Sequence, residues 1–328
     1  MQIFRAAPAA IARTTVALIV VGLLAACSAS LPYADPADVG AYPGNGGDTP
    51  LLVDAAWLSR RIASDGADLA ILDLSPLRTY RAGHVPGAIH AWWQDTMELN
   101  NVVYGVILSP HDPAVRENLL KDLGIGPQTM VVAYDNDRGR WAARMVWFLR
   151  FLGHERTGAL DGGLAAWRGS GGSTDRDAHT GATRTAAAPN PTKGLYLNTE
   201  QLRTALAVPG SVLVDVRTPD EARDTVGETL PSGRIPGSVS VPWTSSLRDG
   251  SGRLESADEL LRLFAAAGVT PGRSVILYAR FGVETDQTWL VLKLLGFADV
   301  AIYDRGWAGW TTTPDLPVEP LGPPTPPS

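Results

Sequence analysis

The sequence contains one cysteine, Cys27, among its 328 residues. A chain with a single cysteine has no internal disulfide, so the stability of its folded part must come from burial of an apolar core. The sequence also lacks a convincing membrane span. The mostly apolar run of residues 14–26 is 13 residues long, whereas a helix needs roughly 20 apolar residues to cross a bilayer.

Several chemical signatures are absent as well. The five histidines are scattered and show no metal-ligand spacing such as His-Glu-x-x-His; they are His84, His90, His111, His154 and His179. We therefore predict no metal site and no cofactor, and expect His84 to make a structural hydrogen bond. The chain has no Gly-x-Ser-x-Gly elbow and no phosphate-binding loop ending in Gly-Lys-Ser/Thr. A net charge of −6 gives no electrostatic reason to bind nucleic acid.

The first 27 residues have the form of an export signal. Arg5 and Arg13 form a basic start, and the apolar run after them ends in small side chains. Leu24-Ala25-Ala26-Cys27 resembles the bacterial lipobox, in which the cysteine sulfur receives a diacylglycerol and becomes the mature N-terminus. The resemblance implies a lipoprotein anchored to the membrane through Cys27, with its folded part on the extracytoplasmic side. An ordinary signal peptide that happens to contain a cysteine is the alternative.

The composition of the rest of the chain is that of a globular protein with two domains. Apolar residues make up 45% and charged residues 19% of the sequence, and about 300 residues are enough for two cores. Segments rich in Gly, Pro, Ser, Thr and Ala, without apolar periodicity, divide the chain. The predicted parts are a signal peptide (1–27), a tether (28–50), a first domain (51–170), a linker (171–194), a second domain (195–312) and a Pro-rich tail (313–328).

The two predicted domains are copies of one another. Gly-His-Val-Pro-Gly-Ala in the first copy matches Gly-Arg-Ile-Pro-Gly-Ser in the second, and Leu-Asp-Gly-Gly-Leu-Ala-Ala-Trp matches Tyr-Asp-Arg-Gly-Trp-Ala-Gly-Trp. The matched segments are 71–73 with 214–215, 83–88 with 233–238, 132–134 with 276–278, and 160–167 with 303–310. Their order is conserved and their spacing nearly constant, which indicates an internal repeat. A larger offset at the second match places an inserted surface loop near residues 225–232.

Each copy alternates short apolar runs with helical patterns. In the second copy we predict strands at 211–215, 274–278 and 300–303, and helices at 198–207, 256–267, 285–295 and 306–310. Continuous apolar strands that alternate with helices indicate an α/β fold, with a parallel sheet flanked by helices in each domain. Ligands of such sheets bind at the carboxyl ends of the strands.

The loop after the strand at 274–278 is the candidate site. It reads Ala279-Arg280-Phe281-Gly282-Val283-Glu284 and leads directly into a helix. A short glycine-containing loop at a helix N-terminus directs backbone N–H groups inward and so forms a cradle for an anion. The same geometry lowers the pKa of a cysteine at its first position. Here that position is an alanine, Ala279.

These motifs resemble the tandem-domain rhodaneses, which are thiosulfate or 3-mercaptopyruvate sulfurtransferases. The resemblance covers about residues 51–312. It implies two rhodanese-like domains, the first of an inactive type, and a loop in the second whose cysteine carries sulfane sulfur as a persulfide. Ala279 stands at that cysteine's position, and Asp135 at the corresponding position of the first domain. Phe281 stands where a lysine can occur, and Glu284 where a hydroxyl residue is usual.

We therefore expect an impaired or inactive sulfurtransferase. A methyl group can neither attack thiosulfate nor hold sulfur, and Glu284 adds a negative charge to the cradle. Arg217 and Arg280 remain as candidates to hold a small anion, and an envelope protein is the other possible partner.

Two enzymatic alternatives stay open. The first is sulfur transfer by a non-standard route, for example through the thiol of a partner. The second is hydrolysis through Asp135, with Arg138 and Arg140 binding a phosphate. A simpler interpretation of Asp135 is that it caps the following helix.

Overall fold

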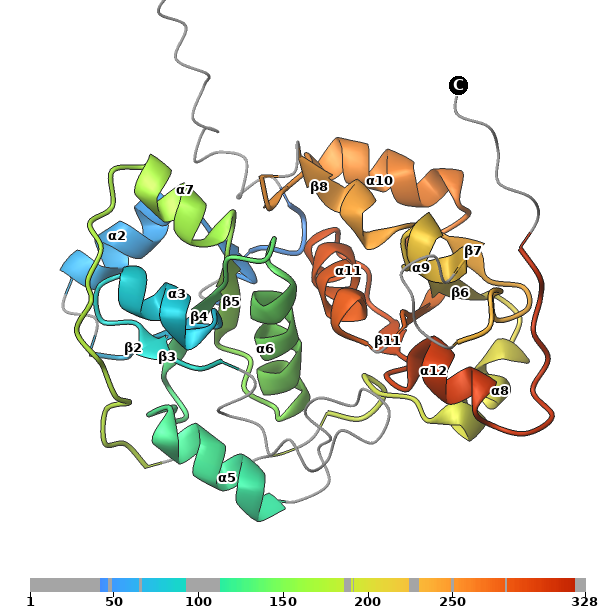
Figure 1. The fold of residues 1–328 in the computed structure, drawn as a ribbon, viewed down its shortest axis with the longest axis horizontal. Coiled ribbons are helices and arrows are strands. Elements are labelled where there is room, and N and C mark those ends of the chain that lie inside the picture. Colours follow the sequence, from blue (N-terminus) through green and yellow to red (C-terminus); the bar gives the residue numbers. More distant parts are fainter. Residues whose placement is uncertain are drawn as a thin grey trace, which may run out of the picture. The chain divides into compact units, whose positions relative to one another are not determined.

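The first domain consists of a five-stranded sheet with helices on both sides in a computed structural model of the protein (Figure 1). The strand order is β1-β5-β4-β2-β3, and all four pairings are parallel. The strands are β1 (Leu52–Val53), β2 (Leu69–Asp73), β3 (Ile89–His90), β4 (Met130–Tyr134) and β5 (Thr157–Leu160). The helices are α2 (Ala55–Ala63), α3 (Leu77–Ala82), α5 (Pro113–Asp122), α6 (Arg140–Phe151) and α7 (Gly163–Gly169).

The second domain repeats this plan with a parallel sheet in the order β11-β10-β6-β7. Its strands are β6 (Ser211–Asp215), β7 (Val239–Ser240), β10 (Ser274–Tyr278) and β11 (Val300–Ile302); β8 (Leu247–Arg248) and β9 (Arg253–Leu254) form a separate antiparallel pair. Its helices are α8 (Thr199–Leu206), α9 (Pro219–Arg223), α10 (Ala257–Ala266), α11 (Val283–Leu294), α12 (Gly306–Thr311) and the 3₁₀ helix η2 (Trp243–Ser246).

The structure describes residues 42–46, 49–64, 67–92, 113–185, 190, 192–223, 230–248, 251–280 and 282–321. The predicted signal peptide with Cys27, the loop residue Phe281 and most of the predicted insertion at 225–232 lie outside these residues. No helix within the described part of the chain is long and apolar enough to cross a membrane.

Local sequence explains where several helices begin. Asp54 caps α2 by accepting a hydrogen bond from the Trp57 N–H, as expected of an N-cap aspartate. Asn198 and Ser256 form reciprocal capping boxes with Gln201 and Glu259 at the starts of α8 and α10. These polar signals fix the helix starts without help from the core.

The central strands are buried on both faces, as parallel strands between helix layers should be. Every residue of β4 is buried, and β6 and β10 are buried after their first residue. The two domains belong to one compact unit, and α6 of the first packs against α11 of the second (Figure 1). One continuous apolar cluster runs through this contact and includes Trp147 and Trp289.

The predicted α/β class, with two domains that are each a parallel sheet flanked by helices, is confirmed. The predicted strands at 211–215 and 274–278 match β6 and β10 residue for residue. The largest difference is α11, which begins at Val283 rather than at residue 285. Gly282 adopts the left-handed conformation there (φ 105°) and turns the chain into the helix earlier than apolar periodicity alone indicates.

The segment predicted as a linker returns along the first domain. Asp175 forms an isolated antiparallel bridge with His84, and His179 a parallel bridge with Ile89. Farther on, Arg184 donates to the carbonyl oxygen of Gly124 at 2.7 Å. Residues 171–185 thus add an outer layer to the first domain, because their backbone groups find partners on it.

Candidate functional site

The loop that follows β10 is held against the start of α12. Ala279 has no exposed surface, and its carbonyl oxygen accepts a hydrogen bond from the Trp307 N–H at 2.8 Å. The Arg280 carbonyl accepts from the Ala308 N–H at 3.3 Å. The first residues of the loop are therefore fixed by backbone contacts that depend little on the side chain at position 279.

Glycines make this close approach possible. A Cβ atom on Gly306 (φ 54°) would lie 2.5 Å from the carbonyl oxygen of Ala279. In the first domain, a Cβ on Gly163 would collide with the carbonyl oxygen of Asp135 in the same way. The matching Asp-x-Gly motifs thus have one physical reason: the helix after the last strand must touch the loop without a side chain between them.

In the first domain, the cradle is occupied by the protein's own carboxylate. Oδ1 of Asp135 accepts from the N–H groups of Asp137 (2.7 Å) and Gly139 (2.9 Å), and Oδ2 accepts from Ala142 (2.9 Å). Burial raises the pKa of this carboxyl, and the three N–H groups oppose that rise. Oδ1 is committed to the loop before α6 and Oδ2 to the first turn of α6. Asp135 therefore caps this helix and is not available as a nucleophile.

In the second domain, Glu284 at the start of α11 is paired across the domain contact. Nη1 of Arg140 donates to Oε1 of Glu284 at 2.8 Å, and the same guanidinium also binds Asp137. Burial raises the pKa of Glu284, and the Arg140 charge opposes the rise. The guanidinium groups of Arg138 and Arg140 stack on the indole of Trp243, with their Cζ atoms 4.7 and 5.3 Å from the ring centroid. The negative charge of Glu284 is therefore compensated by the first domain.

A second arginine of α6 reaches behind the same loop. Arg144 is buried, and its Nη1 lies 3.0 Å from both Oδ2 of Asp286 and Oδ1 of Asp304. Burial, with repulsion from Asp304 as a further cause, raises the pKa of Asp286 to about 8, and the Arg144 charge opposes this rise only in part. Asp304 in turn lies so close to Gly282 that a Cβ atom there would collide with Oδ1. Arg144 thus ties the first domain to the base of the loop.

Arg217, predicted to bind an anion, is already committed to the protein. Its Nε and Nη2 form a bidentate pair with Asp215 at 2.9 and 2.6 Å, and Nη2 also donates to the Gly233 carbonyl at 2.7 Å. The guanidinium is buried over the ring of Trp307. Within the described structure this arginine serves to join β6 to the Pro-Gly motif, and anion binding by Arg217 stays a prediction.

Comparison with known families agrees with the repeat. The model of the rhodanese-like domain matches the chain twice, at residues 54–170 and 198–313. The chain belongs to the rhodanese-like domain family. The tandem rhodanese architecture predicted from the motifs is thereby confirmed.

Relatives that match this rhodanese over nearly their whole length include thiosulfate sulfurtransferases and a sulfur carrier protein. It is 29% identical to the thiosulfate sulfurtransferase of Pseudomonas aeruginosa over 281 residues, which cover 83% of this chain and 98% of the relative. It is 28% identical to that of Azotobacter vinelandii, over 82% of this chain and 97% of the relative. The sulfur carrier protein TtuD of Thermus thermophilus is 26% identical, over 82% of this chain and 96% of the relative.

A solved structure supports the fold alone. The anaerobic ergothioneine biosynthesis enzyme from Chlorobium limicola, solved with trimethyl histidine, superimposes with a TM-score of 0.74 at 22% identity. The match covers 83% of this rhodanese and 71% of the other chain.

Of the residues predicted to form the loop, Ala279, Arg280 and Gly282 lie between β10 and α11, and Val283 and Glu284 begin α11. Sequence reasoning missed that Arg140 and Arg144 complete it from the other domain. Arg144 carried a signal, since it lies within the largely apolar Arg140–Phe151 helix, where a charged side chain needs a buried partner. Sequence reasoning also missed a cluster of His84, Asp175 and His179, because 91 residues separate the first member from the second (175 − 84).

Proposed function

We propose that this rhodanese keeps the sulfurtransferase fold but carries no sulfur itself, and that it binds a small, singly charged anion at the 279–284 loop. The observation that carries the proposal is Ala279, which takes the first loop position after β10 and is completely buried. Persulfide chemistry needs a thiolate at such a position. An envelope protein is the alternative occupant of the same region.

The neighbouring side chains do not replace the missing nucleophile. The hydroxyl of Thr285 donates to the carbonyl oxygen of Gly282. Asp135, the equivalent residue of the first domain, is held by three backbone N–H groups. Asp135 thus caps its own helix, and the Thr285 hydroxyl is bonded to a backbone carbonyl.

The charge balance favours a ligand with one negative charge. Arg140 is paired with Glu284, and Arg217 with Asp215. Arg144 faces two carboxylates, so its surroundings are acidic. A doubly charged anion such as thiosulfate would need more positive charge than Arg280 and the helix N-terminus supply. A carboxylate or sulfonate group needs only one positive charge.

We further propose that the protein is extracytoplasmic and anchored through Cys27, which the lipobox-like sequence supports. Buried acyl chains contribute about 0.8 kcal/mol per CH₂ group, so two or more chains hold a protein on a membrane. Substitution of Cys27 by Ser should release the protein from membranes and abolish incorporation of labelled palmitate. Retention of the label in Cys27→Ser would contradict lipidation at this site.

The claim that the protein carries no sulfur is tested by measuring sulfur transfer from thiosulfate to cyanide. The measurement uses the Cys27→Ser background, in which no thiol remains. We expect the rate to equal that of buffer alone, and intact-mass analysis after thiosulfate treatment to show no added sulfur. A rate clearly above buffer that disappears in Arg280→Gln would overturn the proposal and establish catalysis by a non-standard route.

Anion binding is tested separately by thermal unfolding. Methanesulfonate carries one charge and should raise the Tm of the wild type by mass action. Sulfate also stabilises folded proteins without a binding site, so the comparison is between proteins at one methanesulfonate concentration. Arg280→Gln should lose the shift in Tm, whereas exchange of the exposed Arg203 on α8 for Gln should leave it intact. Equal shifts in all three proteins would mean that the loop holds no anion.

A further inference from the structure

His84, in the Pro-Gly motif of the first domain, has one ring nitrogen that finds no partner. Its Nδ1 lies 2.9 Å from the carbonyl oxygen of Tyr80. A carbonyl can only accept, so Nδ1 carries the proton and, in the neutral ring, Nε2 presents a lone pair. The side chain has no exposed surface, and Nε2 has no hydrogen-bond partner within the described part of the chain. Leaving such a buried polar group unsatisfied is unfavourable.

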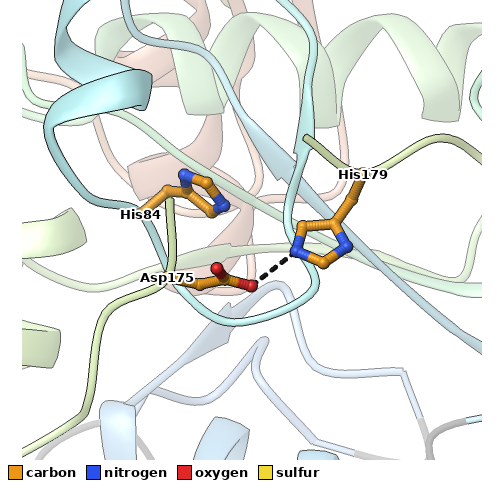
Figure 2. A group of neighbouring side chains, drawn as sticks. All are labelled: His84, Asp175 and His179. Carbon is orange, nitrogen blue, oxygen red and sulfur yellow. Dashed lines mark hydrogen bonds and ion pairs between the residues drawn. The ribbon is translucent and has the colours of Figure 1, made fainter. Parts of the chain in front are cut away.

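Two more ligand atoms lie beside this nitrogen. Nε2 of His179 is 2.6 Å from Oδ2 of Asp175, and the ligand atoms of all three residues lie within 4.8 Å of one another. Figure 2 shows the three side chains turned toward one another.

The surroundings hold these side chains in place. The ring of Tyr80 stacks on that of His84 at a centroid distance of 3.8 Å. Asp175 is tied to His84 through two backbone hydrogen bonds of 3.0 and 2.9 Å. Its Oδ1 accepts from the Asp177 N–H at 2.8 Å, and Oδ2 faces His179. The site is therefore organised before any ligand enters.

We propose that His84, Asp175 and His179 form a binding site for a divalent transition-metal cation, with Zn²⁺ as the best match. Two imidazoles and one carboxylate are a common zinc ligand set, and a water molecule would complete a tetrahedron. His84 meets a further requirement, since metal-bound histidines usually donate their other N–H to a carbonyl or carboxylate. Asp175 and His179 are partly exposed, with 24% and 33% of their side-chain surfaces accessible, which provides the route of entry.

Small movements would bring the three ligand atoms to the spacing of a metal site. Ligand atoms about 2.0–2.2 Å from Zn²⁺ lie roughly 3.3 Å apart in a tetrahedron. The ligand atoms of Asp175 and His179, now 2.6 Å apart, must separate slightly. The ligand atom of His84 must approach those of Asp175 and His179 from distances of 4.8 Å or less. Because His84 belongs to the sheet domain and the other two to the returning segment, the cation would fasten residues 171–185 to the first domain.

The test is zinc binding by the purified full-length protein in detergent, in the Cys27→Ser background so that no thiol competes. After treatment with EDTA and its removal, competition with a chromogenic chelator gives affinity and stoichiometry. We expect one tight equivalent in the parent protein and at least a tenfold weaker affinity in Asp175→Asn and His179→Gln. Both residues lie on the outer segment, so these variants should fold.

His90→Gln is the matched control. The His90 ring centroid lies 5.0 Å from that of Tyr80, but His90 does not belong to the cluster of His84, Asp175 and His179. It should bind zinc like the parent protein. Zinc should also raise the Tm of the parent and of His90→Gln but not that of Asp175→Asn. The proposal would be overturned if the parent protein bound no zinc ion tightly. It would also be overturned if Asp175→Asn and His179→Gln bound zinc with the same affinity as the parent protein.

Discussion

Arg140 of the first domain and Glu284 of the second form an ion pair of 2.8 Å across the domain contact. A second bond joins the same regions, since the Gln287 side-chain amide donates to the Arg138 carbonyl oxygen at 3.1 Å. The loops that follow β4 and β10 therefore meet at the boundary between the repeats. One loop is filled by the Asp135 carboxylate, and the other begins with Ala279, whose side chain is neither a carboxylate nor a thiol.

Ala279→Cys should create a thiol that accepts sulfur. The start of α11 would stabilise its thiolate, and we expect treatment with thiosulfate to add one sulfur atom per chain. Replacing Glu284 by Thr in the same protein removes a nearby negative charge and should raise the rate on the order of tenfold. Intact-mass analysis and transfer to cyanide measure both effects, in the Cys27→Ser background.

Ala279→Ser is the control, since it adds a similar volume without a thiol. A folded Ala279→Cys protein that takes up no sulfur, with or without Glu284→Thr, would show that the pocket itself has changed and that more than the nucleophile is missing.

Arg144→Met should destabilise the protein by about 3–5 kcal/mol, because it leaves Asp286 and Asp304 buried without their counter-charge. Urea unfolding followed by tryptophan fluorescence measures the loss. Arg203→Met, at an exposed position of α8, should change the free energy of unfolding by less than about 0.5 kcal/mol. A cost below about 1 kcal/mol for Arg144→Met would argue against a structural role for the buried cluster.

Asp286 should make stability depend on pH. Burial first, and repulsion from Asp304 as a further cause, raise its pKa to about 8 in the folded protein, from an ordinary 3.8. The folded state then binds the proton more tightly than the unfolded chain, so this group's contribution to stability is full below about pH 4 and is lost as pH rises toward 8. Asp286→Asn cannot titrate, and its stability relative to the wild type should increase between pH 5 and 8 by at least about 1 kcal/mol.

Unfolding in urea at four pH values across this range gives the comparison. Asp258→Asn, an exposed position on α10, should differ from the wild type by a constant amount. If the difference for Asp286→Asn is also constant, the cluster does not hold a proton on this carboxyl.

The repeat could be found without a structure because the same bonds hold both copies together. The hydroxyl of Tyr134 donates to Asp73 at 2.7 Å, and that of Tyr278 donates to Asp215 at 2.8 Å. Each tyrosine hydroxyl also accepts from a backbone N–H of its Pro-Gly motif. These bonds join residues far apart in the chain, and they constrain residue types strongly enough to leave a visible pattern in the sequence.

Charge partners could not be predicted in this way. The sequence indicated that Arg217 could bind an anionic ligand. Only the structure showed that its guanidinium is paired with Asp215, two residues earlier. Glu284 appeared to add an unbalanced charge, and its partner Arg140 lies 144 positions away (284 − 140). The sequence lists the charged groups, whereas pairing depends on the packing of α6 against α11.

The sequence by itself determined the tandem α/β architecture, the place of the loop and the absence of a thiol at Ala279, because apolar periodicity, glycine positions and residue identity are local properties. Tertiary structure alone decided that Asp135 fills its own cradle, that Arg140 and Arg144 complete the second loop, and that His84 meets Asp175 and His179. Each of those outcomes depends on distances between segments remote in the chain, which are set only when the two cores pack.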